Sequence, residues 1–192
     1  MLTMKTSERL FAACSGLCWL IICLLSLTAT GCSAVNDDKD NKNDEETEYI
    51  KVGDRVPLFT VNVVKADGTS AVFSTEHLTG ETIIVLFNTS CKDCQRELPR
   101  MNSYYLQHID DPGFQMVAIS REEGAGSIEE FWKANQLSIP YSAQADRRIY
   151  NMFASSVIPR VYFCSADGTV TKIFIEEVDM IIGPGGQIHP LD

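Results

Sequence analysis

Positively charged residues are scarce in this sequence. Its 192 residues include 16 Lys and Arg against 26 Asp and Glu, which gives a formal net charge of −10 at pH 7. An acidic surface repels phosphate groups, so this balance argues against nucleic acid as a partner and against electrostatic binding to anionic lipid. No internal repeat is visible in the chain either.

Histidine is also scarce. The three histidines, His77, His108 and His189, are scattered along the chain, and none is paired with another at the spacing of metal ligands. A structural zinc site needs four ligands, so a pair of cysteines would lack two partners. We expect neither a metal site nor a cofactor.

Only one long uncharged apolar run is present. It covers 17 residues, 11–27, and follows Lys5 and Arg9. A membrane-spanning helix needs roughly 20 apolar residues, so the length and the basic flank are typical of a bacterial export signal.

The end of this run resembles a lipobox, the motif at which a bacterial lipoprotein signal is cut. The residues read LTATGC and close at Cys32, with Ala29 in the usual leucine position. The motif predicts a signal over residues 1–31 and lipidation of Cys32. An ordinary cleaved signal, or a retained anchor with an unmodified Cys32, stays open.

The chain after Cys32 is acidic and nearly free of apolar residues. Residues 33–48 contain seven acidic residues and two lysines. Such a stretch cannot bury enough surface to order itself, so residues 32–48 are predicted to be a flexible tether with a reach of roughly 20–25 Å. It also resembles the acidic export signal of some surface-exposed lipoproteins, although a plain linker fits as well. Residues 49–192 have the size of one domain.

Cysteine is rare once the predicted signal is removed. Besides Cys32, only Cys91, Cys94 and Cys164 remain, so no framework of disulfides holds the fold. Cys164 falls in an apolar, strand-like pattern. We expect a buried and inert thiol there, with a resolving or sensing cysteine as the alternative.

Cys91 and Cys94 lie at the boundary between two segments. The apolar run 82–87 precedes them and predicts a buried central strand, and the amphipathic stretch from about 95 to 108 predicts a helix. A strand that delivers CxxC to the start of a helix is typical of thiol–disulfide chemistry. The helix N-terminus would stabilise a Cys91 thiolate, and Cys94 could then attack the mixed disulfide. A structural disulfide, or half of a zinc site, is the alternative.

Apolar periodicity predicts the remaining elements. Strands are expected over residues 59–64 and 70–73, joined by a turn at Asp67-Gly68, and over residues 114–120. Ser127-x-x-Glu130 reads as a capping box that starts a second helix. A strand–helix–strand–helix order implies parallel pairing. Shorter elements are a helical turn over residues 74–78, a helix near Asp146, a hairpin at Asp167-Gly168 and a short helix near residues 178–182.

Taken together, residues 52–175 resemble the thioredoxin superfamily, and in particular the membrane-tethered thiol–disulfide oxidoreductases of the TlpA/ResA type, which overlap in sequence with AhpC/TSA peroxiredoxins. The features are the N-terminal hairpin, CxxC after a buried strand, Glu97 and Pro99 after the pair, Ile158-Pro159 before a strand, and the final hairpin. The resemblance implies an α/β, thioredoxin-like fold, with a central mixed β-sheet flanked by helices and an N-terminal β-hairpin extension.

The same resemblance implies roles for individual residues. Cys91 would be the attacking thiol and Cys94 the resolving one, and together they would form the redox-active disulfide. Pro159 would be cis and would lie against the pair, which leaves the Ile158 backbone free to pair with a substrate strand. Glu97 would accept or hand on the Cys94 proton.

Three features depart from the family. Thr89-Ser90 stands where an aromatic residue usually precedes the first cysteine, and Lys92-Asp93 replaces a proline-containing pair. Lys92 would favour a Cys91 thiolate and Asp93 would oppose it, and both could contact substrate. The usual closing helix also looks truncated, so a partner or second subunit could cover that face.

The predicted function is therefore a lipid-anchored thiol–disulfide oxidoreductase in the cell envelope. It would reduce disulfides of protein substrates and receive electrons from an upstream donor. A thiol peroxidase is the nearest alternative, but Ile84 and Asn88 replace the proline and the Thr or Ser of the peroxidase motif. A lipoprotein that uses the fold only for binding or assembly is the alternative of another class.

Overall fold

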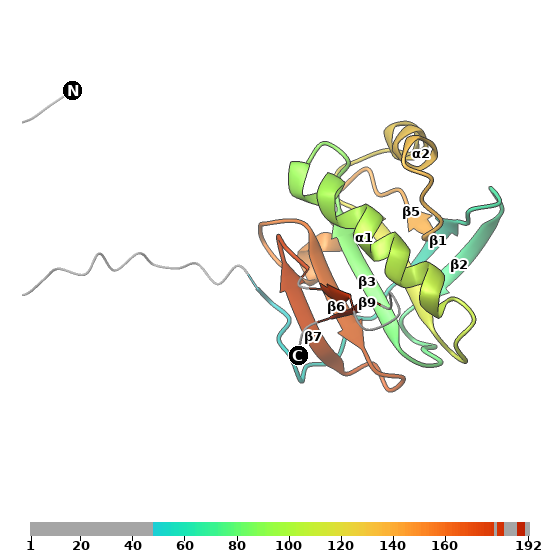
Figure 1. Ribbon diagram of the computed structural model, residues 1–192. Coiled ribbons are helices and arrows are strands. Elements are labelled where there is room, and N and C mark those ends of the chain that lie inside the picture. The colour runs from blue at the N-terminus through green and yellow to red at the C-terminus, as the bar shows by residue number, and fades with distance from the viewer. Residues whose placement is uncertain (1–47, 179, 183–187, 191–192) are drawn as a thin grey trace, which may run out of the picture. The chain divides into compact units, whose positions relative to one another are not determined.

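The structure is a computed structural model that describes residues 48–178, 180–182 and 188–190 (Figure 1). The predicted signal, Cys32 and all of the predicted tether except Glu48 lie outside these residues. The elements follow one another in the order β1 (Thr60–Val64), β2 (Ser70–Ser74), β3 (Thr82–Phe87), α1 (Lys92–His108), β4 (Gln115–Ser120), α2 (Ala125–Ala134), β5 (Tyr141–Ser142), a 3-10 turn (Tyr150–Met152), β6 (Arg160–Cys164), β7 (Val170–Ile175), β8 (Met180–Ile182) and β9 (Ile188–Pro190).

A seven-stranded mixed sheet forms the centre of the fold, in the order β2-β1-β5-β4-β3-β6-β7. All six residues of β3 are buried. This strand pairs in parallel with β4 and antiparallel with β6, so the β-branched run becomes the covered central strand that its composition predicts. The two outer hairpins, β1–β2 and β6–β7, are antiparallel as predicted.

Both long helices cover the same face of this sheet. The chain steps from β3 to β4 and then to β5, each time in the same direction, and right-handed crossovers then place α1 and α2 on one side. Ring contacts agree, since Tyr104 of α1 packs on Phe163 and Trp132 of α2 packs on Phe87, with ring centroids 6.0 Å and 5.0 Å apart. Figure 1 shows α1 lying across the sheet.

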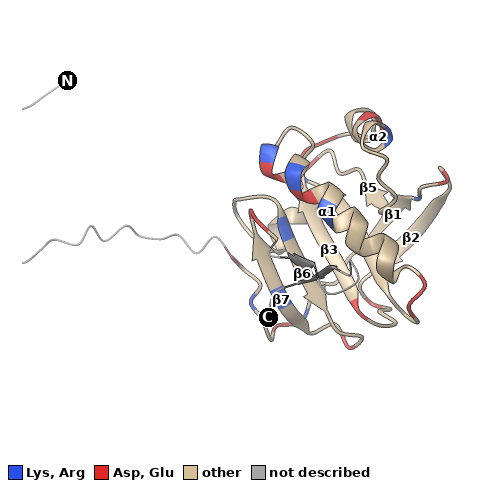
Figure 2. Cartoon of the chain, in the orientation of Figure 1, with Lys and Arg blue, Asp and Glu red and all other residues tan. Residues whose placement is uncertain are grey.

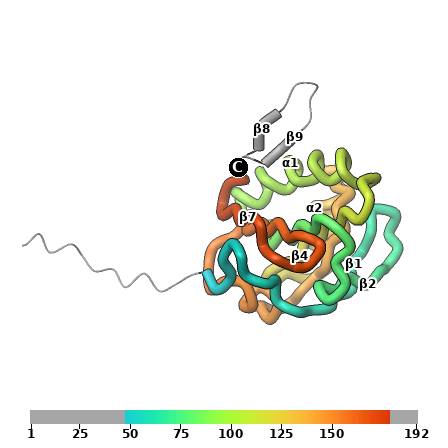
Figure 3. The backbone as a smooth tube through the Cα atoms, turned by 90° about the horizontal axis from the view of Figure 1, so that it is seen from below, coloured from blue at the N-terminus to red at the C-terminus, as the bar shows by residue number. Residues whose placement is uncertain are grey.

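Among the described residues, no long helix covers the opposite face. Phe153, at the end of the 3-10 turn, lies against Phe59 and Tyr162, with ring centroids 6.0 Å and 4.8 Å apart. The segment before β1 runs beside the β6–β7 hairpin, where the Gly53 N–H donates a hydrogen bond of 2.8 Å to the Val170 carbonyl (Figure 3).

Two short predicted elements and the predicted start of one helix were wrong. Residues 75–77 form a turn rather than a helix, because the Thr75 hydroxyl bonds to the backbone of Phe59 and Pro57. Helix α2 starts three residues earlier than the predicted capping box and has Gly124 as its N-cap, so the Ser127 hydroxyl bonds back to the Gly124 carbonyl at 3.4 Å.

The third correction concerns the end of the chain. The short helix expected near residues 178–182 is instead the strand β8, which pairs with β9. Strand β9 lies against α1. A hairpin thus lies beside α1 in the part of the chain where the usual closing helix looked truncated.

Trp132 should contribute more to stability than its neighbour Phe131. It is buried, packs on Phe87 and Tyr141, and donates a hydrogen bond of 2.8 Å to the Ile139 carbonyl. We expect Trp132→Ala to lower the free energy of unfolding by about 3–5 kcal/mol, measured by urea denaturation of the soluble chain from residue 33. The matched change Phe131→Ala removes a half-buried ring and should cost clearly less. Equal losses would contradict this packing.

Candidate functional site

The turn between β3 and α1 presents the first cysteine at the start of the helix. Cys91 is the N-cap of α1, with φ −79° and ψ 123°. Its N–H donates to the Asn88 carbonyl at 3.1 Å, and the Asn88 side chain accepts bonds from the N–H and hydroxyl of Ser90 at 2.9 Å and 2.6 Å. An asparagine turn of this kind redirects the chain from strand to helix. It leaves Cys91 half-buried at the N-terminus of α1, where the N–H groups of the first turn have no partner within the helix.

Cys94 lies one turn further along α1 and is fully buried. Burial raises the pKa of its thiol, and the neighbouring Cys91 acts in the same direction, while a backbone hydrogen bond with Asn88 and the charge of Arg121 lower it. Both cysteines are free thiols in the structure. The accessible sulfur is therefore suited to meet a substrate, and the shielded one to react only with its neighbour.

The loop before β6 lies against Cys91. The Ile158–Pro159 peptide bond is cis, as the resemblance implies. The Cys91 thiol donates a long hydrogen bond of 3.5 Å to the Ile158 carbonyl. The structure thus brings together Cys91, Cys94 and the Ile158-Pro159 pair from segments more than sixty residues apart.

Two buried side chains that the sequence did not single out hold this loop. The Tyr150 hydroxyl donates to the Val157 carbonyl at 2.7 Å. The Arg160 guanidinium donates to the carbonyls of Ser156 and Val157 at 2.9–3.2 Å. Arg160 is 1% exposed and also lies 3.8 Å from the Glu48 carboxylate. The sequence did offer one sign of this role, because Arg160 is a charged residue inside the apolar run VIPRVYFC.

Glu97 is buried on α1, with 1% of its surface exposed. Its carboxylate accepts a bond of 2.8 Å from Arg96 and lies 3.4 Å from the Arg100 guanidinium, and the Val178 N–H reaches it at 3.4 Å. These contacts compensate its charge. Its predicted exchange of a proton with Cys94 stays a prediction.

The two residues between the cysteines differ in their surroundings. Lys92 is exposed at the first turn of α1, whereas Asp93 pairs with the Arg96 guanidinium at 2.7 Å. Arg96 therefore offsets the unfavourable effect that Asp93 was expected to have on a Cys91 thiolate. Basic and acidic residues alternate on the first turns of α1 (Figure 2).

Thr89, one of the two residues that stand where an aromatic residue usually precedes the first cysteine, is held by a buried carboxylate. The Thr89 N–H donates to Glu123 at 2.7 Å, and its hydroxyl forms a second, short bond to the same carboxylate. The Gln95 side chain donates to the Thr89 carbonyl at 2.8 Å. Hydrogen bonds thus fix the segment before Cys91, in place of the packing that an aromatic ring would give.

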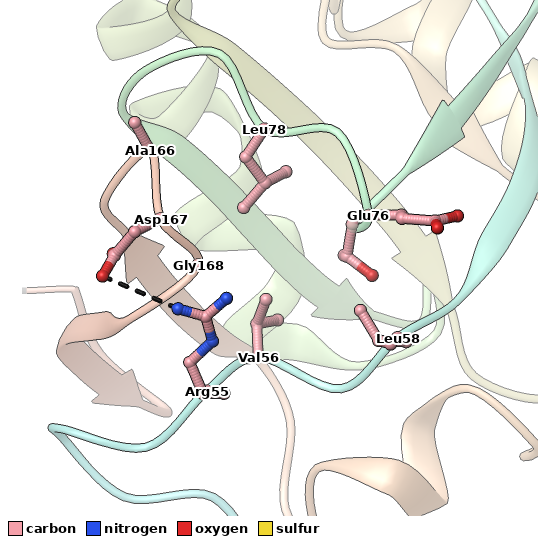
Figure 4. A pocket seen from close by; sticks show the side chains of 9 residues that line it. Arg55, Val56, Leu58, Glu76, Leu78, Ala166, Asp167 and Gly168 are labelled. Atoms are coloured by element: carbon pink, nitrogen blue, oxygen red, sulfur yellow. Dashed lines mark ion pairs between the residues drawn. The ribbon is translucent and has the colours of Figure 1, made fainter.

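A cavity of about 480 Å³ lies away from the cysteines (Figure 4). The Arg55–Asp167 ion pair of 3.6 Å lies at this cavity, and the remaining side chains come from the segment before β1, the turn after β2 and the β6–β7 turn. Within the described part of the chain, no group of His, Cys, Asp and Glu residues is arranged to hold a metal ion.

A profile of the AhpC/TSA family matches residues 52–173. The chain belongs to the AhpC/TSA family. The thiol-disulfide oxidoreductase ResA of Bacillus subtilis is 26% identical over 171 residues, which cover 88% of this chain and 87% of ResA.

Solved structures agree with this assignment at the level of the fold. A thiol:disulfide interchange protein of the thioredoxin family from Chlorobium tepidum superposes with a TM-score of 0.52 at 22% identity, over 71% of this chain and 90% of that one. A peroxidoxin from Mycobacterium tuberculosis superposes with a TM-score of 0.54 at 14% identity, over 67% and 87%. The predicted thioredoxin-like fold of the TlpA/ResA type is thus confirmed.

Within the residues that the structure describes, this AhpC/TSA member has no helix whose length and hydropathy would let it span a membrane.

The three described cysteines should differ sharply in reactivity. Burial raises the pKa of the Cys164 thiol to about 12 and also raises that of Cys94, so at neutral pH both stay protonated and shielded. We expect iodoacetamide at pH 7 to modify Cys91 first in the reduced protein, as read by mass spectrometry of its peptides. Unfolded protein, in which all three should react alike, is the control. Modification of Cys164 as fast as Cys91 would contradict the burial.

Proposed function

We propose that this protein is a lipid-anchored thiol–disulfide oxidoreductase of the cell envelope that reduces protein disulfides through Cys91 and Cys94. One observation carries the proposal. A half-buried cysteine caps a helix beside the carbonyl that precedes a cis proline, and a fully buried cysteine lies one turn behind it. The family match and the similarity to ResA support the oxidoreductase class.

The reaction would proceed in two exchanges. The Cys91 thiolate attacks one sulfur of the substrate disulfide, a Cys91–substrate bond forms, and the other substrate sulfur leaves as a thiolate that takes up a proton. Cys94 then loses its proton and attacks the Cys91 sulfur. The Cys91–Cys94 disulfide forms and the second substrate thiol is released. Two electrons pass to the substrate, so an upstream donor must reduce the enzyme again.

Substrate would bind across the surface that surrounds Cys91. The Ile158 backbone would pair with an extended substrate segment, and the distance of 3.5 Å between its carbonyl and the Cys91 sulfur supports this role. Lys92 and Asp93 flank the sulfur on the helix side. Pro159 would close the other side. Glu97 would relay the Cys94 proton. Its carboxylate is held by ion pairs with Arg96 and Arg100.

Substitution of Cys91, and separately of Cys164, distinguishes a catalytic role from a structural one. We expect Cys91→Ser to lower the rate of insulin disulfide reduction at least 100-fold, because serine cannot form the mixed disulfide. Cys164→Ser, a change at a buried thiol away from the pair, is the matched control and should keep the wild-type rate. Full activity of Cys91→Ser would refute the mechanism.

The anchor is proposed from the sequence alone, with residues 1–31 as signal, Cys32 as lipidation site and residues 32–48 as tether to the domain 49–192. We expect the native chain to incorporate labelled fatty acid and to sediment with membranes, and Cys32→Ala to lose the label. A labelled Cys32→Ala protein would show that the lipid is not carried by this residue.

A peroxidase is the second candidate. The chain matches the AhpC/TSA family, and its fold is similar to that of a Mycobacterium peroxidoxin. In the structure Asn88, at the Thr or Ser position of the peroxidase motif, forms the turn before Cys91. Consumption of hydrogen peroxide by the reduced protein, faster than its reduction of insulin, would favour this candidate over the first.

A further inference from the structure

The loop that precedes β6, residues 155–159, contains a strained backbone residue. Val157 has a φ of +69°. This left-handed region is uncommon for residues other than glycine and is especially unfavourable for a β-branched side chain. Such a conformation persists only where the surrounding structure holds it. The Ile158 carbonyl that faces the Cys91 sulfur follows directly, so the groups that hold Val157 also position this carbonyl.

Two arginines hold consecutive carbonyls of this loop. Arg147 donates to the Ser155 carbonyl at 2.6 Å, and Arg160 donates to the two carbonyls that follow. The two cations differ in their access to solvent, because the side chain of Arg147 is 32% exposed and that of Arg160 only 1%. Water can solvate the first charge, whereas the second depends on neighbouring groups of the protein.

The buried charge of Arg160 has one nearby counter-charge in the described part of the chain. Its Nη1 atom is buried and has no hydrogen-bond partner among these residues. The Glu48 carboxylate is the one found within 4.0 Å of this guanidinium, with 3.8 Å between its Oε1 atom and Nη1. A buried cation that loses its negative partner costs free energy. The position of Arg160 therefore depends on Glu48.

Backbone contacts keep Glu48 beside the loop. Glu48 forms an antiparallel bridge with Ala154, and the Tyr49 N–H donates to the Phe153 carbonyl at 2.9 Å. The loop begins at the next residue. Glu48 is also the last residue of the predicted tether. This end of the predicted tether is therefore bonded to the chain directly before the loop and, through its carboxylate, to the arginine that holds the loop.

We infer that Glu48 is a positioning residue of the dithiol site, because as the counter-charge of Arg160 it keeps the Ile158 backbone where a substrate segment binds. The inference rests on the proposed function. Glu48 takes part in no bond that forms or breaks, and it acts through Arg160. The segment that the sequence predicts to be a plain tether thus ends in a residue that supports substrate binding.

Hydrogen exchange tests whether Glu48 holds the loop. Glu48→Gln removes the charge and nearly keeps the shape of the side chain. We expect the amides of residues 155–158 to exchange about fivefold faster in this variant, because Arg160 without its counter-charge holds the loop less firmly. Mass spectrometry of the loop peptide from the reduced chain, starting at residue 33, measures the rate. Glu48→Asp, which keeps the charge on a shorter side chain, should recover part of the protection.

Glu122→Gln is the matched control. Glu122 pairs at 3.2 Å with Arg147, which holds the same loop but is partly exposed. Water can replace this counter-charge, so exchange at residues 155–158 should stay within about a factor of two of the wild type. Equal acceleration by both variants would overturn the inference, as would unchanged exchange in Glu48→Gln. Faster exchange of β3 as well would mean that Glu48 supports the whole fold, which also overturns it.

Substrate binding gives the second readout. With insulin as substrate and dithiothreitol as reductant, we expect Glu48→Gln to raise KM about fivefold at nearly unchanged kcat, since a smaller fraction of the protein has the loop in its binding position. The rate with dithiodipyridine, a disulfide too small to pair with the loop, should not change. A lower kcat at unchanged KM, or an equal loss with both disulfides, would contradict a role in substrate positioning.

Failure of the proposed function would look different. A wild-type protein that does not reduce insulin would refute that function. Exchange at residues 155–158 in Glu48→Gln and Glu122→Gln would still decide whether Glu48 holds the loop, because it is measured without any substrate.

Discussion

The hydrogen bonds that Asn88 makes at the end of β3 determine where α1 begins, and the placement of both cysteines depends on that. A fully buried strand delivers the chain to this turn. The N–H of Cys91 is held at 3.1 Å by the Asn88 carbonyl, so the helix starts at Lys92. Cys91 then lies at the positive end of the helix dipole, while Cys94, on the next position that faces the sheet, has no exposed surface.

Acidic and basic side chains alternate on the first turns of α1, which carry the two cysteines. Arg96 and Arg100 neutralise Asp93 and Glu97 on α1. These ion pairs remove two negative charges from the surroundings of the thiols, where negative charge would oppose thiolate formation. The electrostatics of the site therefore come from the arrangement of neighbours, and the net charge of −10 says little about them.

Strong local patterns were read correctly from the sequence. The run 82–87 became β3 with the predicted bounds, and Asp67-Gly68 and Asp167-Gly168 each closed a hairpin. Weak local signals failed where a tertiary contact competed with them. Thr75 could have begun a helical turn, but its hydroxyl holds the Phe59 backbone instead. Gly124, with no side chain to cap a helix, still precedes α2.

Sequence patterns could not predict which residues support the site. Glu123 meets Thr89 across 34 positions of the chain. Arg121 and Tyr150 come from separate segments and meet only in the folded protein. No periodicity or motif encodes such contacts. The cysteines and Ile158-Pro159, by contrast, belong to motifs that a resemblance can carry, and the structure brings them together.

The reduction potential of the Cys91–Cys94 pair tests the central claim most directly, by titration of the soluble chain with reduced and oxidised glutathione. A potential between about −180 and −270 mV is the value expected for a disulfide-exchange catalyst. A disulfide that glutathione cannot reduce, in a protein that stays inactive toward insulin after chemical reduction, would instead identify the pair as a structural bond and contradict the account.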